Sequence, residues 1–325
     1  MEDLVDILLA TYNTNEKYLR KQIESILRQT HKNIKLYISD DHSSNANIIE
    51  ILKEYAQKDS RIKLFIQPHN LGYNKNFEFL LKQSNAEYIM FSDHDDVWYI
   101  DKVEKSLKQL KEKNVDMAYC NCRQINENGI VLKENYLKYK NVPIVFKKDK
   151  LAISRCVGIG CSQIITKYVK DKMIPFKDEV IAHDWLAAFI ASEGKGITCI
   201  KEPLFDYRLH NTNVFGGRNL SQNLKRWKEK NGQGYKSFCL YRKDVIHRAY
   251  YDGILMCEKY TEDEEDKKFI EKSKKYYETI LNNKIIYTNV RTYFKILGGK
   301  NQFKKEIREI VLFHFPLIAY IKFSI

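Results

Sequence analysis

Three aspartates within four residues are the densest chemical signal in the sequence. Asp93, Asp95 and Asp96 come directly after the apolar run Tyr88 to Phe91. Carboxylates at this spacing repel one another unless a cation or a network of hydrogen-bond donors compensates their charge. Their hard oxygens suit Mg²⁺ or Mn²⁺, which usually complete their coordination with water and substrate phosphates. The spacing favours a divalent-metal site, and a solvated turn that caps the next helix is the alternative.

Polar clusters follow three earlier apolar runs in the same way. A single cluster of this kind is ordinary turn chemistry, because Asp and Asn favour loops and helix caps. In an open parallel sheet, however, the carboxyl ends of the strands meet at one edge, and ligands bind there. Four clusters at successive strand ends therefore predict one shared ligand site. The three earlier clusters are Thr11-Tyr12-Asn13, Asp40-Asp41, and His69-Asn70 with Gly72.

The elements that must position these clusters are short β-rich runs that alternate with segments of helical period. This alternation, over the first 120 residues, is typical of a parallel sheet covered by helices. Between the strands, apolar residues recur at helical spacing, as Leu19, Ile23 and Ile26 do, and each such set makes one apolar helix face. The predicted strands are Val5 to Ala10, Ile34 to Ile38, Ile62 to Ile66, Tyr88 to Phe91 and Met117 to Cys120.

The pattern changes after the fifth predicted strand. Asn128-Gly129 lies between two extended runs and predicts a hairpin turn, since both residue types tolerate positive φ. Beyond Gly216-Gly217 the chain becomes rich in Tyr and Lys with helical period. We therefore expect a catalytic domain over residues 1–217, with a mixed second half, and a helical basic region over residues 218–325.

Composition and charge narrow the class of protein. With 325 residues and 44% hydrophobic content, the chain can bury the core of an enzyme-sized domain. The net charge of +13 is uneven, because 23 Lys and Arg face 13 Asp and Glu from Arg218 onward, which leaves +3 for the rest. The charge thus belongs mainly to the C-terminal region, and we expect no nucleic-acid partner.

The sequence also predicts a compartment. Met1 to Asp6 lack the pattern of a signal peptide, and no run approaches the roughly 20 apolar residues of a membrane span, so a cytoplasmic location is expected. Seven scattered cysteines form neither a paired framework nor zinc-type doublets, which predicts reduced thiols. The segment from Lys304 to Phe323 is apolar and bounded by charges. It can lie peripherally on the inner face of the cell membrane, or dock on its own domain or on the second subunit of a homodimer.

Three motifs together resemble the family 2 glycosyltransferases of GT-A fold, in particular their rhamnosyltransferase-like bacterial members. They are Ala10-Thr11-Tyr12-Asn13, Asp40-Asp41-His42-Ser43, and Phe91-Ser92-Asp93-His94-Asp95-Asp96-Val97-Trp98. The resemblance spans roughly residues 3 to 215. It implies an α/β fold with a mostly parallel, Rossmann-like sheet, a mixed second half and a helical C-terminal appendage.

The resemblance also implies roles for the clustered residues. Tyr12 would stack near the nucleobase, Asp41 would bind the base, and Asp93 the ribose. Asp95 would hold the Mn²⁺ or Mg²⁺ that binds the diphosphate, and Asp96 would support it. The donor-binding set predicted in this way is Thr11, Tyr12, Asn13, Asp41, Asn70, Asp93 and Arg208, and the metal-binding set is Asp95, Asp96 and His210.

Two later motifs complete the resemblance. His183-Asp184-Trp185 matches the position where the family carries Glu-Asp and uses the aspartate as general base, with histidine here in place of glutamate. The alternative is that Asp184 is only a helix N-cap. Tyr207-Arg208-Leu209-His210 resembles the late motif in which the imidazole reaches the metal and the basic residue reaches the diphosphate.

The expected activity is an inverting, metal-dependent transfer of a sugar from a nucleoside diphosphate donor to a hydroxyl. UDP-hexose or dTDP-rhamnose is the expected donor, and a glycan or lipid-linked molecule of bacterial surface polysaccharide synthesis the expected acceptor. One rival function is a sugar-1-phosphate nucleotidyltransferase, although Thr11 to Leu19 contains none of the glycines of its phosphate loop. The other is a non-catalytic scaffold that binds sugar nucleotides.

Overall fold

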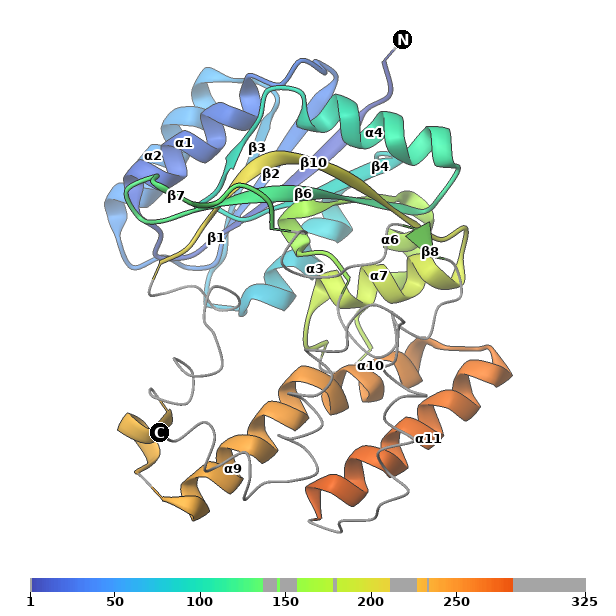
Figure 1. Cartoon of the computed structure of the whole chain (residues 1–325). Coiled ribbons are helices and arrows are strands. Elements are labelled where there is room, and N and C mark those ends of the chain that lie inside the picture. Colours follow the sequence, from blue (N-terminus) through green and yellow to red (C-terminus); the bar gives the residue numbers. More distant parts are fainter. Residues whose placement is uncertain are drawn as a thin grey trace. The chain divides into compact units, whose positions relative to one another are not determined.

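The computed structural model describes residues 2–136, 145–146, 157–177, 180–210, 227–232 and 234–282. Among these, residues 2–210 form one compact unit and residues 227–282 a second one (Figure 1). The predicted domain boundary near Arg218 lies outside the described residues.

A mixed sheet forms the centre of the first unit, with strand order β3-β2-β1-β4-β9-β6-β10-β5. The four strands from β3 to β4 are parallel, β9 is antiparallel to both of its neighbours, and β10 is parallel to β6. Short strands β7 and β8 pair with β6 and β10. The strands are β1 Val5–Thr11, β2 Ile34–Asp40, β3 Ile62–Ile66, β4 Tyr88–Ser92, β5 Val97–Trp98, β6 Met117–Ile125, β7 Val131–Lys133, β8 Val145–Phe146, β9 Gln163–Thr166 and β10 Ile197–Arg208.

The five strands predicted from the sequence are confirmed, and β9 is an addition to them. It has four residues and enters the sheet between β4 and β6, antiparallel to both. This insertion turns the parallel sheet of the first half into the mixed sheet of the second. It also carries the turn that precedes β9 to the edge of the sheet where β4 ends, close to the acidic loop.

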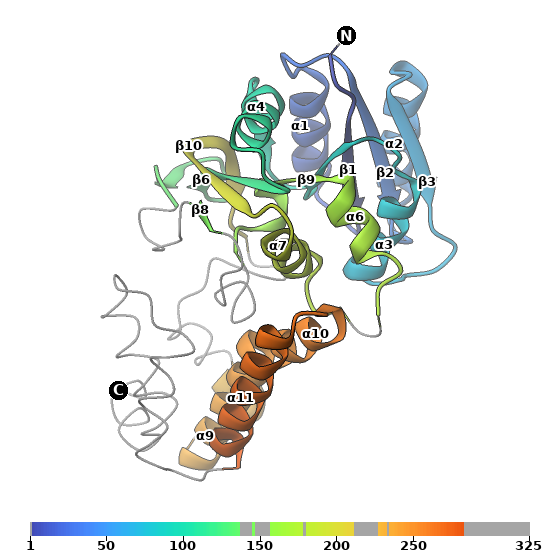
Figure 2. The same cartoon turned by 90° about the vertical axis from the view of Figure 1, so that its right-hand side faces the viewer.

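Helices cover both faces of the sheet (Figure 2). Helices α1, α2 and α4 share one apolar core with alternate residues of β1, namely Val5, Ile7 and Leu9. On the opposite face Phe77 of α3 packs edge-on against Phe91 of β4, with ring centroids 5.6 Å apart. Burial on both faces explains why these strands are almost continuously hydrophobic. The helices are α1 Glu16–Leu27, α2 Ala46–Lys58, α3 Tyr73–Gln83, α4 Lys102–Lys113, α6 Lys167–Met173 and α7 His183–Glu193.

The predicted hairpin at Asn128-Gly129 is confirmed as the turn between β6 and β7. Asn126 Oδ1 accepts hydrogen bonds from the amides of Asn128 and Ile130, and Gly129 adopts a φ of 85°. Only Gly129 takes the left-handed conformation, which explains its place in the turn. This turn becomes relevant to the site, because its carbonyls bind Arg208.

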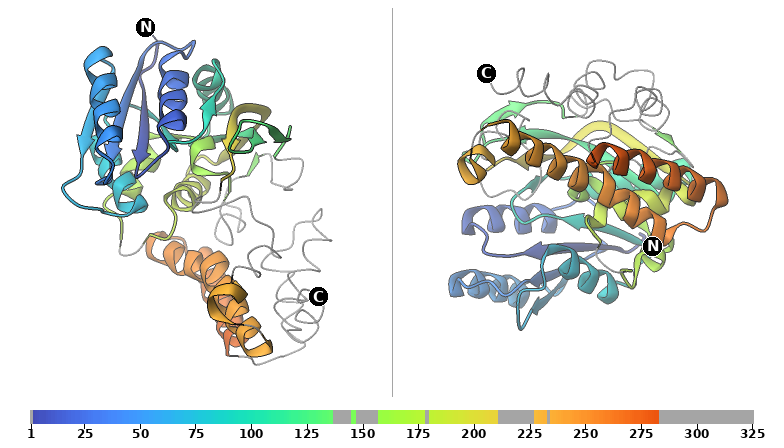
Figure 3. Two further views of the ribbon diagram at one scale, coloured as in Figure 1. Left: turned by 90° about the vertical axis from the view of Figure 1, so that its left-hand side faces the viewer. Right: turned by 90° about the horizontal axis from the view of Figure 1, so that it is seen from below.

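The second unit is helical in its described part (Figure 3). It contains α9 Tyr235–Ile246, a short π-helix at His247–Tyr251, α10 Asp252–Tyr260 and α11 Glu264–Leu281. Asp263 caps α11 by accepting hydrogen bonds from the amides of two residues in its first turn. The helices found among the described residues are all too short or too polar to cross a membrane. The predicted membrane-facing segment, residues 304–323, lies outside the described part of the chain.

Candidate active site

The loops after β1 and β2 are tied together by their own polar side chains. Thr11 Oγ1 donates to Asp40 Oδ1 at 2.8 Å, and the Ser43 amide donates to Asp40 Oδ2 at 2.8 Å. The Asn13 amide donates to Ser43 Oγ, while Asn13 Oδ1 accepts from the Ser44 amide at 2.9 Å. Thr11 and Asn13, predicted to contact the donor, are thus observed to hold these loops in place, and a direct donor contact stays a prediction.

The next two predicted donor contacts differ in exposure. The Tyr12 ring is 48% exposed, as a stacking platform for a nucleobase must be. Asp41 is buried, and its carboxylate accepts from the amides of Leu71 and Gly72 at 2.6 and 2.9 Å. Asn70 Nδ2 donates to the Asp41 carbonyl at 3.1 Å. Asp41 and Asn70 are therefore brought together, and Asp41 fixes the loop that leads into α3.

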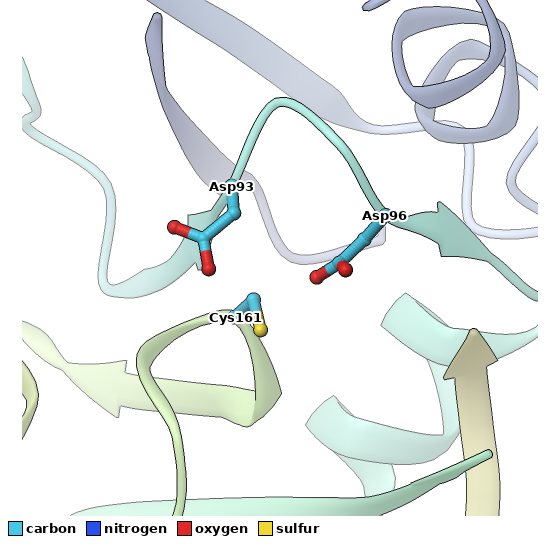
Figure 4. Close-up of side chains that lie close together, drawn as sticks. All are labelled: Asp93, Asp96 and Cys161. Atoms are coloured by element: carbon cyan, nitrogen blue, oxygen red, sulfur yellow. The ribbon is translucent and has the colours of Figure 1, made fainter. Parts of the chain in front are cut away.

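The acidic loop after β4 places two carboxylates beside a thiol (Figure 4). Ligand atoms of Asp93, Asp96 and Cys161 all lie within 4.8 Å of one another. Cys161 belongs to the short 3-10 helix Gly160–Ser162, and its side chain points between the two aspartates. Burial, together with the charge of Asp95, raises the pKa of Asp93 to about 6. Burial and both neighbouring aspartates raise the pKa of Asp96 well above its usual range.

The third aspartate has a separate partner. Asp95 Oδ2 lies 2.6 Å from His210 Nε2, and both side chains are largely buried. Burial alone would raise the pKa of Asp95, but the hydrogen bond from His210 and the charges of His94 and His210 outweigh it and lower the pKa. The contact between Asp95 and His210 brings together two of the three residues predicted to bind the metal.

Arg208 joins this loop to the β6–β7 turn. Its Nε donates to the Asp95 carbonyl at 2.8 Å, and its Nη1 donates to the carbonyls of Asn126 and Glu127 at 3.2 and 3.3 Å. The guanidinium also stacks 4.3 Å from the centre of the Tyr18 ring. Arg208 is 2% exposed, so its observed role is to fix the acidic loop, and its predicted contact with the diphosphate stays a prediction.

The charge that Asp96 carries when ionised is compensated by protein groups on two sides. Its Oδ1 accepts from the Arg208 amide at 3.0 Å, whereas its buried Oδ2 has no hydrogen-bond partner among the described residues. The fully buried Lys102 donates its ammonium group to the Cys161 carbonyl and lies 3.7 Å from the centre of the Trp98 ring. Burial lowers the pKa of Lys102, and the charge of Asp96 acts in the opposite direction. Lys102 thus supplies positive potential beneath the acidic loop.

The ligand atoms offered by this loop and by His210 fit a divalent ion. Two ligands at adjacent corners of an octahedron with bonds of about 2.1 Å lie about 3 Å apart. The 2.6 Å between Asp95 Oδ2 and His210 Nε2 needs only a slight widening to reach that separation. Carboxylate oxygens suit both Mn²⁺ and Mg²⁺, whereas an imidazole ligand favours Mn²⁺ over Mg²⁺. The orphaned Oδ2 of Asp96 is a further acceptor on the same loop.

Asp184 reaches the acidic loop through one short turn. Helix α7 begins at His183 with Ala182 at its N-cap, so the alternative that Asp184 is the N-cap is wrong. The Asp184 carboxylate instead accepts from the amides of Gly160 and Trp185 at 3.1 and 2.9 Å. A methyl group at position 160 would lie 2.9 Å from His183 Nε2, which explains the glycine there. Gly160 thus donates its amide to Asp184, and the next residue, Cys161, lies between Asp93 and Asp96.

His183 is enclosed by aromatic rings. Its imidazole stacks on Phe77 at 4.0 Å and meets the edge of Phe91 at 4.8 Å. Both ring nitrogens are buried without a hydrogen-bond partner among the described residues. Burial lowers the pKa of His183 to about 4, so the ring is neutral near pH 7. The neutral ring therefore fills the space between these aromatic side chains, next to Asp184.

Sequence reasoning missed two of these residues, Cys161 and Lys102. Cys161 carries no motif, and only its position before β9, a strand that the pattern did not predict, brings it to the acidic loop. Lys102 opens a helix whose other lysines are half-buried or exposed, and nothing in its local sequence distinguishes it from them.

Comparison with known proteins supports this interpretation of the fold. The model of the family described as "Glycosyl transferase family 2" matches residues 6–172 of this chain. The mixed sheet and the acidic loop at its carboxyl edge define a glycosyltransferase of GT-A fold. Since the match covers more than half of the chain, the chain belongs to glycosyltransferase family 2.

The chain is similar to curated glycosyltransferases over most of their length. An uncharacterised glycosyltransferase of Methanocaldococcus jannaschii is 32% identical over 73% of this chain and 82% of its own. The UDP-Glc:alpha-D-GlcNAc-diphosphoundecaprenol beta-1,3-glucosyltransferase WfgD of Escherichia coli is 30% identical over 70% and 85%. The dTDP-rhamnosyl transferase RfbG of Shigella flexneri is 28% identical over 64% and 73%.

Two solved structures share the fold. TarS of S. aureus in complex with UDP-GlcNAc has a TM-score of 0.57 at 15% identity, covering 98% of this chain and 87% of that one. The mannosyltransferase PcManGT of Pyrobaculum calidifontis, in complex with GDP-Man and Mn²⁺, has a TM-score of 0.52 at 12% identity, covering 98% and 86%. At these identities the likeness concerns the fold alone.

The neutral His183 predicts a pH-dependent stability. An unfolded histidine binds a proton near pH 6.5, whereas His183 in the folded protein does so only near pH 4. The contribution of the neutral His183 to the free energy of unfolding is therefore present above pH 6.5 and is lost as the pH falls toward 4. The loss is about 2 kcal/mol between about pH 6.5 and about pH 5. Urea unfolding of wild type and His183→Leu at both pH values should show a smaller loss in the variant. An equal loss in the two proteins would contradict the neutral buried ring.

Proposed function

We propose that this glycosyltransferase moves a sugar from a nucleoside diphosphate donor to an acceptor hydroxyl, with inversion and with a divalent metal. One observation carries the proposal. Gly160 and Cys161 are consecutive residues, and the first donates its amide to Asp184 while the second lies between Asp93 and Asp96. A candidate base and a candidate diphosphate site are thereby brought to the same turn.

The roles follow from the positions of the side chains. Asp95 and His210 would hold the ion, which, when bound, stabilises the charge that develops on the leaving diphosphate. Asp184 would take the proton from the attacking hydroxyl. With no enzyme nucleophile in this scheme, a single displacement gives inversion. Exposed Tyr12 would stack on the base, and Asp93 would accept from the ribose.

Pyrimidine nucleotides are the proposed donors. The substrates named for WfgD and RfbG, UDP-Glc and dTDP-rhamnose, carry uracil and thymine. A UDP-hexose or dTDP-rhamnose is therefore proposed for this chain as well. The diphosphoundecaprenol acceptor in the name of WfgD supports a lipid-linked glycan acceptor, in the synthesis of a surface polysaccharide. Peripheral attachment to the inner face of the membrane and a homodimer stay predictions.

A donor screen tests the activity. Release of nucleoside diphosphate from UDP-glucose, UDP-GlcNAc, dTDP-rhamnose and GDP-mannose would be measured with and without Mn²⁺. We expect turnover of a uridine or thymidine donor only with the ion. Turnover of none of the four would contradict the proposed function, and formation of a sugar nucleotide from sugar 1-phosphate would favour a nucleotidyltransferase.

Replacement of Asp95 tests the metal site. Asp95→Ala should abolish Mn²⁺-dependent donor binding, because the ion loses a ligand while the diphosphate keeps its charge. Some loss of melting temperature is also expected, because the largely buried His210 loses its carboxylate partner, so binding is compared at a temperature at which both proteins are folded. Titration calorimetry with UDP and Mn²⁺ measures the effect, and Asp59→Ala, on the opposite end of the sheet from this loop, is the control. Binding of UDP and Mn²⁺ by Asp95→Ala as in wild type would show the assignment to be wrong.

Replacement of Asp184 tests the general base. Asp184→Asn keeps the shape of the side chain but cannot accept a proton, so turnover should fall by about 10² to 10⁴ while donor affinity persists. The matched control is Asp171→Asn in α6, an exposed carboxylate that forms ion pairs with Lys167 and Lys170. Steady-state kinetics on the best donor of the screen compares the two variants. Near-wild-type turnover by Asp184→Asn would exclude the base role.

A further inference from the structure

The segment before Asp184 is fastened to the first turn of α3. Asn74 Nδ2 donates to the Val180 carbonyl, and Asn74 Oδ1 accepts from the His183 amide at 3.1 Å. Beside it, the Tyr73 hydroxyl donates to the Ile181 carbonyl. One asparagine side chain thus bridges a carbonyl and an amide three residues apart, and it fixes the backbone that enters α7.

The attachment continues along α3. Phe77 lies three residues after Asn74, on the same side of the helix, and its ring stacks on His183 at 4.0 Å. His183 is therefore held at two points, its amide by Asn74 and its ring by Phe77. Asp184 is the next residue, so its backbone position follows directly from these two contacts.

The other end of this connection is the predicted donor site. Asp41 accepts from the amides of Leu71 and Gly72, and Gly72 is the N-cap of α3. Asn74 lies only two residues further. A continuous set of hydrogen bonds therefore runs from the predicted nucleobase contact, through the start of α3, to the residue before the predicted base.

We propose that Asn74 is a positioning residue for Asp184, which sets the base relative to the donor loop without contacting substrate. The inference rests on the proposed function, in which Asp184 removes the proton of the acceptor. Misplacement of a reacting group by about 1 Å can lower a rate by about 10²-fold. Loss of the Asn74 bridge should therefore reduce turnover far more than donor binding.

Two variants separate this role from a contribution to folding. Asn74→Ala removes both hydrogen bonds, whereas Asn74→Asp keeps the acceptor for the His183 amide and loses the donor to the Val180 carbonyl. An acidic side chain in the first turn of a helix is favourable, so Asn74→Asp should not lower the melting temperature. The control is Asn47→Ala, because Asn47 holds the same second position in α2 but is exposed.

The experiment measures kcat and KM for nucleoside diphosphate release from the donor that the wild type turns over best. We expect kcat to fall about 10- to 100-fold in both Asn74 variants, with KM for the donor within about threefold and Asn47→Ala unchanged. In an Asp184→Asn background, Asn74→Ala should lower kcat by less than about threefold, because no base remains to be positioned. Amide exchange of residues 180–186 should speed up in Asn74→Ala.

The outcomes separate the two proposals. Two results would overturn the positioning role and leave the proposed function intact. One is independent, multiplicative losses of kcat in the double variant. The other is a wild-type kcat in Asn74→Asp together with rapid amide exchange of residues 180–186. If the wild type turns over no donor, the proposed function fails. If Asp184→Asn is fully active, the base role fails and the positioning role of Asn74 fails with it, whereas the transferase activity stands. A rise in the KM for the donor as large as the fall in kcat in Asn74→Ala would assign Asn74 to donor binding and overturn the inference.

Discussion

Burial of negative charge at the carboxyl edge of the sheet is the constraint on which the rest of the site depends. Asp95 and Asp96 are almost fully buried, and the raised pKa of Asp96 shows that a carboxyl group does not readily ionise there without compensation. The protein provides it with the imidazole of His210, the amide of Arg208 and the ammonium group of Lys102. In the proposed function a divalent ion would therefore bind at a site that protein groups already partly neutralise.

The same compensation links parts of the chain that lie far apart in sequence. Arg208 ends β10 and contacts the carbonyls of the β6–β7 turn, while its neighbour His210 reaches Asp95. The turn at Gly160 and Cys161 precedes β9 and contacts both the aspartates and the predicted base. The inserted antiparallel strand β9 thus brings the acidic loop and the predicted base to the same turn.

Several motif residues serve the architecture of the site directly. Thr11 and Asn13 fasten the first two loops to each other, and Asp41 fastens the third. Exposed Tyr12 is left free to face a ligand. Residues of one motif therefore divide into those that hold the loops and those that face outward. Asn74 extends the first group to the segment that leads into α7 and the predicted base.

The parallel strands, the helices between them and the convergence of the polar clusters could be predicted from the sequence, because hydrophobic period and turn residues act over short distances. The tertiary structure decided which partners those clusters have. Contacts such as Asp95 with His210, or Asn74 with His183, join residues more than 100 positions apart, and no local pattern encodes them. Lys102 shows the reason most clearly, because a lysine at a helix start is ordinarily exposed. Only the packing of β5, β10 and the turn before β9 around it encloses its charge.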